Sequence, residues 1–125
     1  MRCRTAARKD GTMEKKLLIE VEAEKSVLAA AILDPSVFPA ARGILRPTDF
    51  GRSAHQVIWK AMEGIADQGE PIDQLTLKHF LDTHGALEGI GGASYILDLA
   101  SCSFAITNWA SHARIVKTMS VLNQL

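Results

Sequence analysis

The apolar residues of this chain recur with the period of α-helices. Residues 54–68 are the most regular stretch, with one stripe of apolar side chains spaced three and four residues apart. Ser53 and Gln56 have the spacing of a capping box, which predicts that this helix begins just after Ser53. No stretch alternates like a strand with enrichment in β-branched residues. The sequence therefore predicts an all-α fold, and we expect the other helices to pack around residues 54–68.

Local signals divide the rest of the chain into shorter helices. Pro35 ends the first helix, Asp73 is placed as an N-cap, and Gly85 is placed as a left-handed helix ending. Trp59 lies at the edge of the central stripe and is interpreted either as partly buried core or as part of a partner surface. The predicted helices besides 54–68 are 25–33, a short one capped by Ser36, 74–84, 93–101 and 109–125, the last capped by Thr107 or Asn108. The predicted inward residues between Pro35 and the central helix are Phe38, Ala41, Leu45 and Phe50.

The last helix carries more apolar surface than one packing face needs. Ile115, Met119 and Leu122 form a stripe, and Val121 and Leu125 lie roughly a third of a turn outside it. A widening apolar arc is typical of a helix that packs on more than one side. Either this helix continues or pairs with another element in a longer parent, or it is an end helix with a broad buried face.

Charge is distributed unevenly along the 125 residues, although the formal net charge is +0. Residues 1–16 carry six basic and two acidic side chains, which leaves eight basic and twelve acidic ones, a net charge of −4, for residues 17–125. Binding to a phosphate backbone needs clustered Lys and Arg, so direct nucleic-acid binding by the folded part is not expected. Residues 1–18 lack helical periodicity and are interpreted as a disordered basic leader or an added tail, with the domain at 19–125.

The cysteine content and the lack of a long apolar run narrow down the cellular location that the sequence predicts. Cys3 and Cys102 cannot form a disulfide framework, which favours a reducing, cytoplasmic location. No apolar run approaches the roughly 20 residues of a membrane span.

No catalytic, cofactor-binding or metal-binding set is predicted. His79 and His84 are five residues apart and do not share a helical face as two metal ligands would. The glycines of residues 89–92 lack the Gly-Lys-Ser/Thr ending of a nucleotide loop. The acidic residues Glu20, Glu22 and Glu24 are interpreted as a solvated helix entrance.

Taken in order, these segments resemble the N-terminal domain of the DnaB-type replicative DNA helicases of bacteria and their phages. The likeness covers residues 20–125. It is carried mainly by residues 22–28 (EAEKSVL), 45–50 (LRPTDF), 55–62 (HQVIWKAM), 69–73 (GEPID), 85–87 (GAL) with Gly91 and Gly92, and 115–117 (IVK).

The resemblance implies a small orthogonal or bundled helical head of about six helices, whose last helix is the first arm of a truncated helical hairpin. In the family, such domains build a collar on the hexameric ring as a trimer of dimers, dock primase and influence helicase loading. ATP and Mg²⁺ belong to a separate motor domain. The implied function is non-catalytic assembly and protein docking. The interface candidates are Trp109, Ile115, Met119, Leu122 and Leu125.

Two other interpretations remain open at this point. The helicase-binding domain of a primase resembles the same fold, and a free-standing phage regulator of replication or a small enzyme would come from a different class.

Overall fold

The computed structural model describes residues 12–101 and 105–124, with the side chains of residues 20–101 and 108–122. Within these ranges every regular element is a helix, which confirms the predicted all-α class. The elements are α1 (Thr12–Leu33), α2 (Val37–Arg42), the 3₁₀ turn η1 (Pro47–Asp49), α3 (Ser53–Asp67), α4 (Gln74–Thr83), the 3₁₀ turn η2 (Glu88–Ile90), α5 (Ala93–Ala100) and α6 (Ala105–Gln124).

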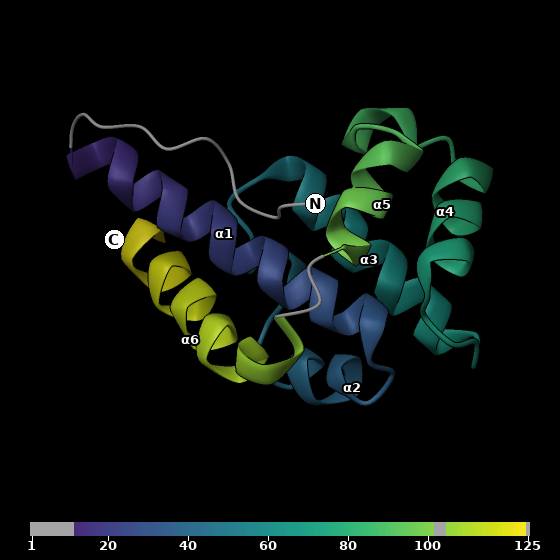
Figure 1. The fold of residues 1–125 in the computed structure, drawn as a ribbon, viewed down its shortest axis with the longest axis horizontal. Helices are drawn as coiled ribbons and strands as arrows, with labels where there is room; N and C mark the ends of the chain where they lie inside the picture. The colour runs from purple at the N-terminus through teal and green to yellow at the C-terminus, as the bar shows by residue number, and fades with distance from the viewer. Residues whose placement is uncertain (1–11, 102–104, 125) are drawn as a thin grey trace.

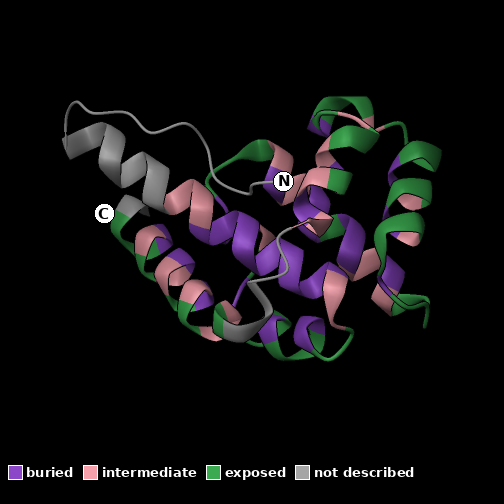
Figure 2. Cartoon of the chain, in the orientation of Figure 1, coloured by how far each residue is buried: buried purple, intermediate pink, exposed green. Residues whose placement is uncertain are grey.

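The long helix α1 lies at the centre of the fold, in place of the predicted centre at α3. It contacts α2, α3, α5 and, most extensively, α6, which runs antiparallel along it (Figure 1). Residues 23–32 of α1 are all buried, as the continuous dark stretch in Figure 2 shows. A helix enclosed on several sides needs small or apolar residues around its whole circumference, and the run Leu28-Ala29-Ala30-Ala31 provides them. That lack of one-sided periodicity is why the sequence pattern pointed to α3.

Three aromatic rings fill the centre of the head. Trp59 of α3 is fully buried, and its ring lies 4.8 Å from that of Phe38 and 5.1 Å from that of Phe50, measured between centroids. Tilted aromatic pairs at this distance contribute to stability beyond their burial alone. The core interpretation of Trp59 is therefore confirmed, as is the inward placement of Phe38, Ala41, Leu45 and Phe50.

Both predicted ends of α4 are confirmed. Asp73 Oδ1 accepts the backbone N–H of Thr76 at 2.8 Å, and the Thr76 hydroxyl oxygen accepts the N–H of Asp73 at 2.9 Å. Gly85 has a φ of +70°, which a residue with a Cβ rarely adopts. The N–H of Ala86 then reaches the carbonyl of Leu81 at 2.8 Å, which closes a Schellman ending.

The start of α3 differs from the prediction. The helix begins at Ser53, with Arg52 as its N-cap and without a side-chain cap hydrogen bond. Gln56 donates its side-chain amide to the carbonyl of Phe50 at 2.7 Å. The capping box predicted for Ser53 and Gln56 is therefore wrong, because the helix starts one residue earlier and Gln56 fastens the preceding loop.

The first and last helices are longer than predicted. Helix α1 begins at Thr12, so it extends through residues 12–18 of the predicted leader; the division of the chain at residues 18 and 19 stays a prediction. Helix α6 begins at Ala105, with non-helical angles at Asn108 (φ −115°, ψ 19°) that mark a kink where the cap was predicted.

Candidate protein interface

The two sides of α6 carry apolar residues of different size. The side that packs on the head contributes Ala113, Val116 and Ser120, all buried. The larger stripe lies elsewhere: Ile115 and Met119 are half-buried, and Leu122 is 49% exposed. Because successive residues of a helix are 100° apart, the centre of this stripe lies roughly a third of a turn from the centre of the buried side. The stripe therefore borders solvent.

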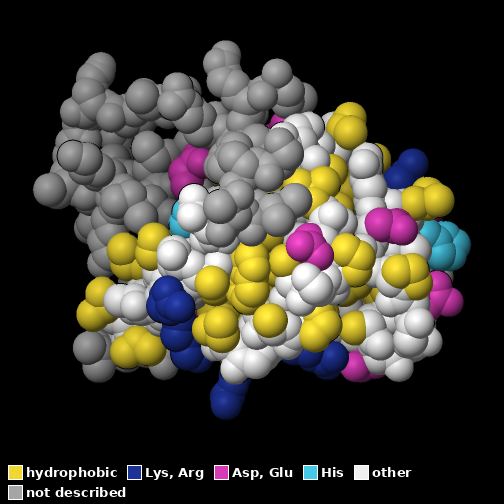
Figure 3. All heavy atoms as spheres, turned by 60° about the horizontal axis from the view of Figure 1, so that its bottom comes forward, with side chains coloured by type: hydrophobic (Ala, Val, Ile, Leu, Met, Phe, Trp, Pro, Cys, Tyr) yellow, Lys and Arg dark blue, Asp and Glu magenta, His cyan; other side chains and the backbone are white. Residues whose placement is uncertain are grey.

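A shallow hollow lies on the outer side of α6. Its volume is about 310 Å³, and it is lined by Arg114, Ile115, Thr118 and Met119. Val121 is also 49% exposed, but it lies about 100° from Leu122 around α6 and faces another direction. Figure 3 turns the lower edge of Figure 1, with α2 and α6, toward the viewer, and apolar side chains reach the surface there between basic ones. Exposed apolar surface is the feature by which contact sites for other proteins are recognised, so this side of α6 is the candidate interface.

The predicted interface residues are thus only partly brought together. Ile115, Met119 and Leu122 share the outer stripe. Trp109 and Ile115 are both half-buried and pack against the core. Met119 and Leu122 are therefore the members of the set that leave the most apolar surface for a partner. Leu125 lies outside the described residues.

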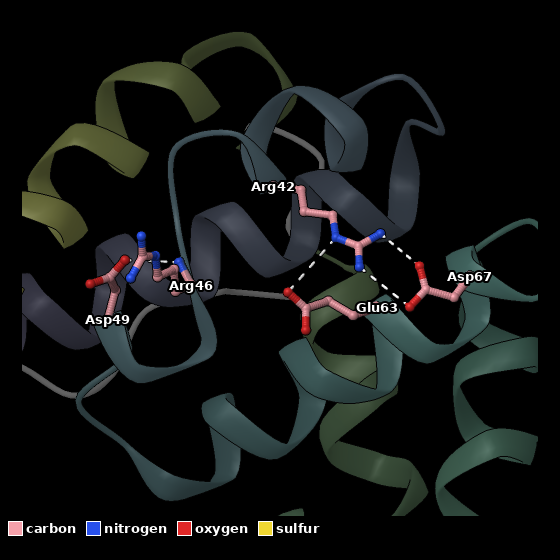
Figure 4. A network of polar contacts seen from close by, with 5 residues as sticks. All are labelled: Arg42, Arg46, Asp49, Glu63 and Asp67. Carbon is pink, nitrogen blue, oxygen red and sulfur yellow. Dashed lines mark hydrogen bonds and ion pairs between the residues drawn. The ribbon is translucent and has the colours of Figure 1, made fainter.

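A buried carboxylate that sequence reading missed links α6 to η1. Asp49 of η1 is 6% exposed and accepts three hydrogen bonds. Its donors are Arg46 N at 2.8 Å, Lys117 Nζ at 3.1 Å and Ser120 Oγ at 2.7 Å. Burial alone raises the pKa of Asp49, but these hydrogen bonds outweigh it and leave that pKa below the ordinary value of 3.8. Figure 4 shows Asp49 beside Arg46, away from the surface ion pairs of Arg42 with Glu63 and Asp67.

A second buried polar cluster joins α1, α3 and α5. His55 is fully buried, and its Nδ1 lies 2.6 Å from Glu24 Oε1 while its Nε2 lies 2.5 Å from the Tyr95 hydroxyl. The other carboxylate oxygen of Glu24 accepts the N–H of Gly51 at 2.7 Å. Burial raises the pKa of Tyr95 to about 12. The prediction that Glu24 belongs to a solvated entrance is wrong, because Glu24 is 3% exposed.

This cluster contains the residue types of a catalytic proton relay, but a substrate cannot reach them. A general base must reach a substrate proton within hydrogen-bond distance. Both ring nitrogens of His55 are occupied by protein partners, and no atom of the ring meets solvent. The hydrogen bonds of the His55 cluster therefore serve to pair buried polar groups with one another.

A second surface hollow lies between α3 and α4. It has a volume of about 570 Å³, and Leu75 at its edge is 72% exposed. Ile65, Gln68, Glu70, Thr76, His79 and Phe80 complete its lining. Within the described part of the chain, no group of three His, Cys, Asp or Glu side chains could hold a metal ion. No described helix is long and apolar enough to cross a membrane.

Comparisons with known proteins agree with this geometry. The family described as "DnaB-like helicase N terminal domain" matches residues 16–118. The replicative DNA helicase DnaB of Geobacillus stearothermophilus is 46% identical over 105 residues, which are 84% of this chain and 23% of that protein. The replicative DNA helicase DnaC of Bacillus subtilis (strain 168) is 40% identical over the same shares. The chain therefore spans about a quarter of the length of these relatives, and their motor domain is not covered.

A solved structure agrees at the level of the fold. The crystal structure of the N-terminal domain of DnaB helicase from Mycobacterium tuberculosis superposes with a TM-score of 0.77 at 37% identity, covering 80% of this chain and 71% of that one. These matches are to helicases, which favours the helicase interpretation over a primase domain or a free-standing regulator. This chain belongs to the family of N-terminal, non-catalytic domains of DnaB-type replicative DNA helicases.

Proposed function

We propose that this domain is an assembly and protein-docking module that supports the hexameric collar of a replicative helicase. In this proposal copies associate through α6, first as dimers, and the assembled collar offers docking sites to primase and to a helicase loader. The membership of the family carries the general role in DNA replication. The surface of α6 is what suggests how the domain performs it.

The observation that carries the proposal is the stripe of Ile115, Met119 and Leu122, in which Ile115 is half-buried against the core, Met119 is half-buried and Leu122 is 49% exposed. Each large apolar side chain removed from water contributes about 1.5–3 kcal/mol when fully buried, so a stripe left at the surface favours association. Either a second copy of the domain or the second arm of a helical hairpin in a longer chain would cover this stripe. The small residues Ala113 and Val116, roughly a third of a turn away, are already buried against the head.

We further propose that this domain leaves nucleic acid and nucleotide to other parts of a helicase. The net charge of −4 on residues 17–125 opposes a phosphate backbone. ATP and Mg²⁺ would belong to the motor domain, and the working location would be the cytoplasm. Isothermal titration of the chain with ATP and Mg²⁺ is expected to give no binding heat. Turnover of ATP by this chain would contradict the proposal.

The self-association test replaces Met119 and Leu122 by Asp. We expect light scattering to detect dimers of the wild-type chain and only monomers of the double variant, because two carboxylates would have to be buried in the interface. The helical circular dichroism signal is expected to stay unchanged, since Leu122 is 49% exposed and Met119 only half-buried.

Leu97→Asp provides the matched control. Leu97 of α5 is 52% exposed, so the same substitution is made at nearly equal exposure on another helix. The control is expected to keep the dimers. If the double variant associates as the wild type does, or if Leu97→Asp alone abolishes association, α6 is not the contact surface.

A further inference from the structure

The orientation of α6 about its own axis is the reverse of what apolar burial alone would select. Ile115 is half-buried against the core, but Met119 is only half-buried and Leu122 is 49% exposed. Turning Met119 and Leu122 onto the head in place of the small residues Ala113 and Ser120 would remove more apolar surface from water. A turn of roughly a third of a revolution would exchange the two sets. Some other interaction must therefore hold the small residues inward and the large ones outward.

Asp49 has the position needed to do this, because the head fixes its carboxylate independently of α6. Asp49 ends a 3₁₀ turn that begins at Pro47. The N–H of Arg46 donates to its Oδ2 at 2.8 Å, and the neighbouring Phe50 is buried in the core with 1% exposure. The acceptor thus belongs to the rigid part of the molecule.

Two donors on α6 meet that acceptor from positions three residues apart. Ser120 Oγ donates to Oδ1 at 2.7 Å, and Lys117 Nζ donates to Oδ2 at 3.1 Å. Side chains reach about 5 Å from a helix axis, so a 30° rotation moves their outer ends by about 2.5 Å. That movement is enough to break a hydrogen bond. Two such bonds to one carboxylate therefore define both the rotation of α6 about its axis and its position along that axis.

We propose that Asp49 is the positioning residue of the α6 interface, holding α6 in the rotation that keeps Met119 and Leu122 at the surface, with Ile115 half-buried between them and the core. The effect of Asp49 on association rests on the proposed function, but its effect on the orientation of α6 does not. The test is therefore built on two separate readouts.

The first readout is the reaction rate of a cysteine placed on the inward side of α6. In a background with Cys3 and Cys102 replaced by Ser, Val116→Cys puts a thiol at a position that is 2% exposed. Asp49→Asn keeps the size of the side chain but removes its charge and one acceptor oxygen. We expect the labelling rate of this thiol to rise about tenfold in the Asp49→Asn variant. The second readout is the dimer fraction by light scattering, which is expected to fall in the same variant.

Leu77→Ala is the control for a general loss of stability. Leu77 is fully buried in α4, away from η1 and α6, so its removal weakens the core without touching Asp49. Under conditions that keep the protein folded, we expect this variant to leave both the labelling rate and the dimer fraction unchanged.

The outcomes separate the two proposals. An unchanged labelling rate in Asp49→Asn, or an equal rise in Leu77→Ala, would overturn the positioning role. A faster rate with an unchanged dimer fraction would support the positioning role and contradict association through α6.

Discussion

The α3 side and the α6 side of this domain are held together in different ways. On the α3 side, Trp59, Phe38 and Phe50 pack as large rings, and the helix that carries Trp59 has one apolar stripe facing inward. On the α6 side, Ala113 and Val116 face the head and a buried carboxylate holds the helix. The comparison teaches that apolar pattern sets orientation where large residues meet, whereas hydrogen bonds to Asp49 set it where small ones do.

The largest expected effect is the loss of stability when the aromatic packing on the α3 side is removed. Trp59→Ala should lower the free energy of unfolding by about 3–5 kcal/mol, because a fully buried ring is removed from between two others. Urea denaturation followed by circular dichroism measures this difference. Trp59→Phe is the control: among the described residues Trp59 Nε1 has no hydrogen-bond partner, so a smaller ring should cost much less. Equal losses in the two variants would contradict the importance of ring packing.

A smaller effect is expected at the polar junction of α1, α3 and α5. Glu24→Ala would leave the N–H of Gly51 and Nδ1 of His55 without their buried acceptor, at a cost of about 3 kcal/mol. Glu88→Ala, at an exposed glutamate of η2, should change stability by less than about 0.5 kcal/mol. Thermal or urea unfolding of both variants tests the contrast. Two equal, small changes would mean that Glu24 is solvated in solution.

The smallest expected effect concerns acid pH and the α6 side. The pKa of Asp49 is lowered in the folded state, so its ionised form stabilises the fold above the ordinary carboxyl pKa, and this stability is lost as pH falls through the folded value. Asp49→Asn should therefore cost about 1.5–2 kcal/mol at about pH 7 and less at about pH 3. Lys117 is 41% exposed, so solvent screens its share.

Urea denaturation of both proteins at the two pH values gives this difference. Hydrogen bonds from Ser36 also lower the pKa of the exposed Asp34. Because Asp34 is present in both proteins, its contribution to the pH dependence cancels in the difference between them. A cost that stays the same at both pH values would contradict the ionised state of Asp49 in the fold.

Sequence patterns predicted the parts of the fold in which one local signal decides the outcome. The amphipathic stripe of residues 54–68 located α3, and Asp73 and Gly85 located the ends of α4, because caps depend on neighbours in the chain. The centre of the fold was misplaced because α1 is surrounded and has no single apolar side.

The candidate site was less accessible to the same reasoning. The period of α6 identified Ile115, Met119 and Leu122 as one stripe, but it could not tell which side faces the head. That choice depends on Asp49, which precedes Lys117 by 68 residues and Ser120 by 71. Glu24 and His55 are likewise 31 residues apart, and neither carries a local signal of burial. Pairings over such distances follow only from the packed structure.

The most direct test of the central claim measures whether association covers the stripe itself. In the background without Cys3 and Cys102, a thiol at Leu122→Cys is labelled over a range of protein concentrations and compared with one at Leu97→Cys. We predict that the rate at position 122 falls as the measured mass rises, while the rate at position 97 stays constant. A rising mass with an unchanged rate at position 122 would contradict assembly through α6.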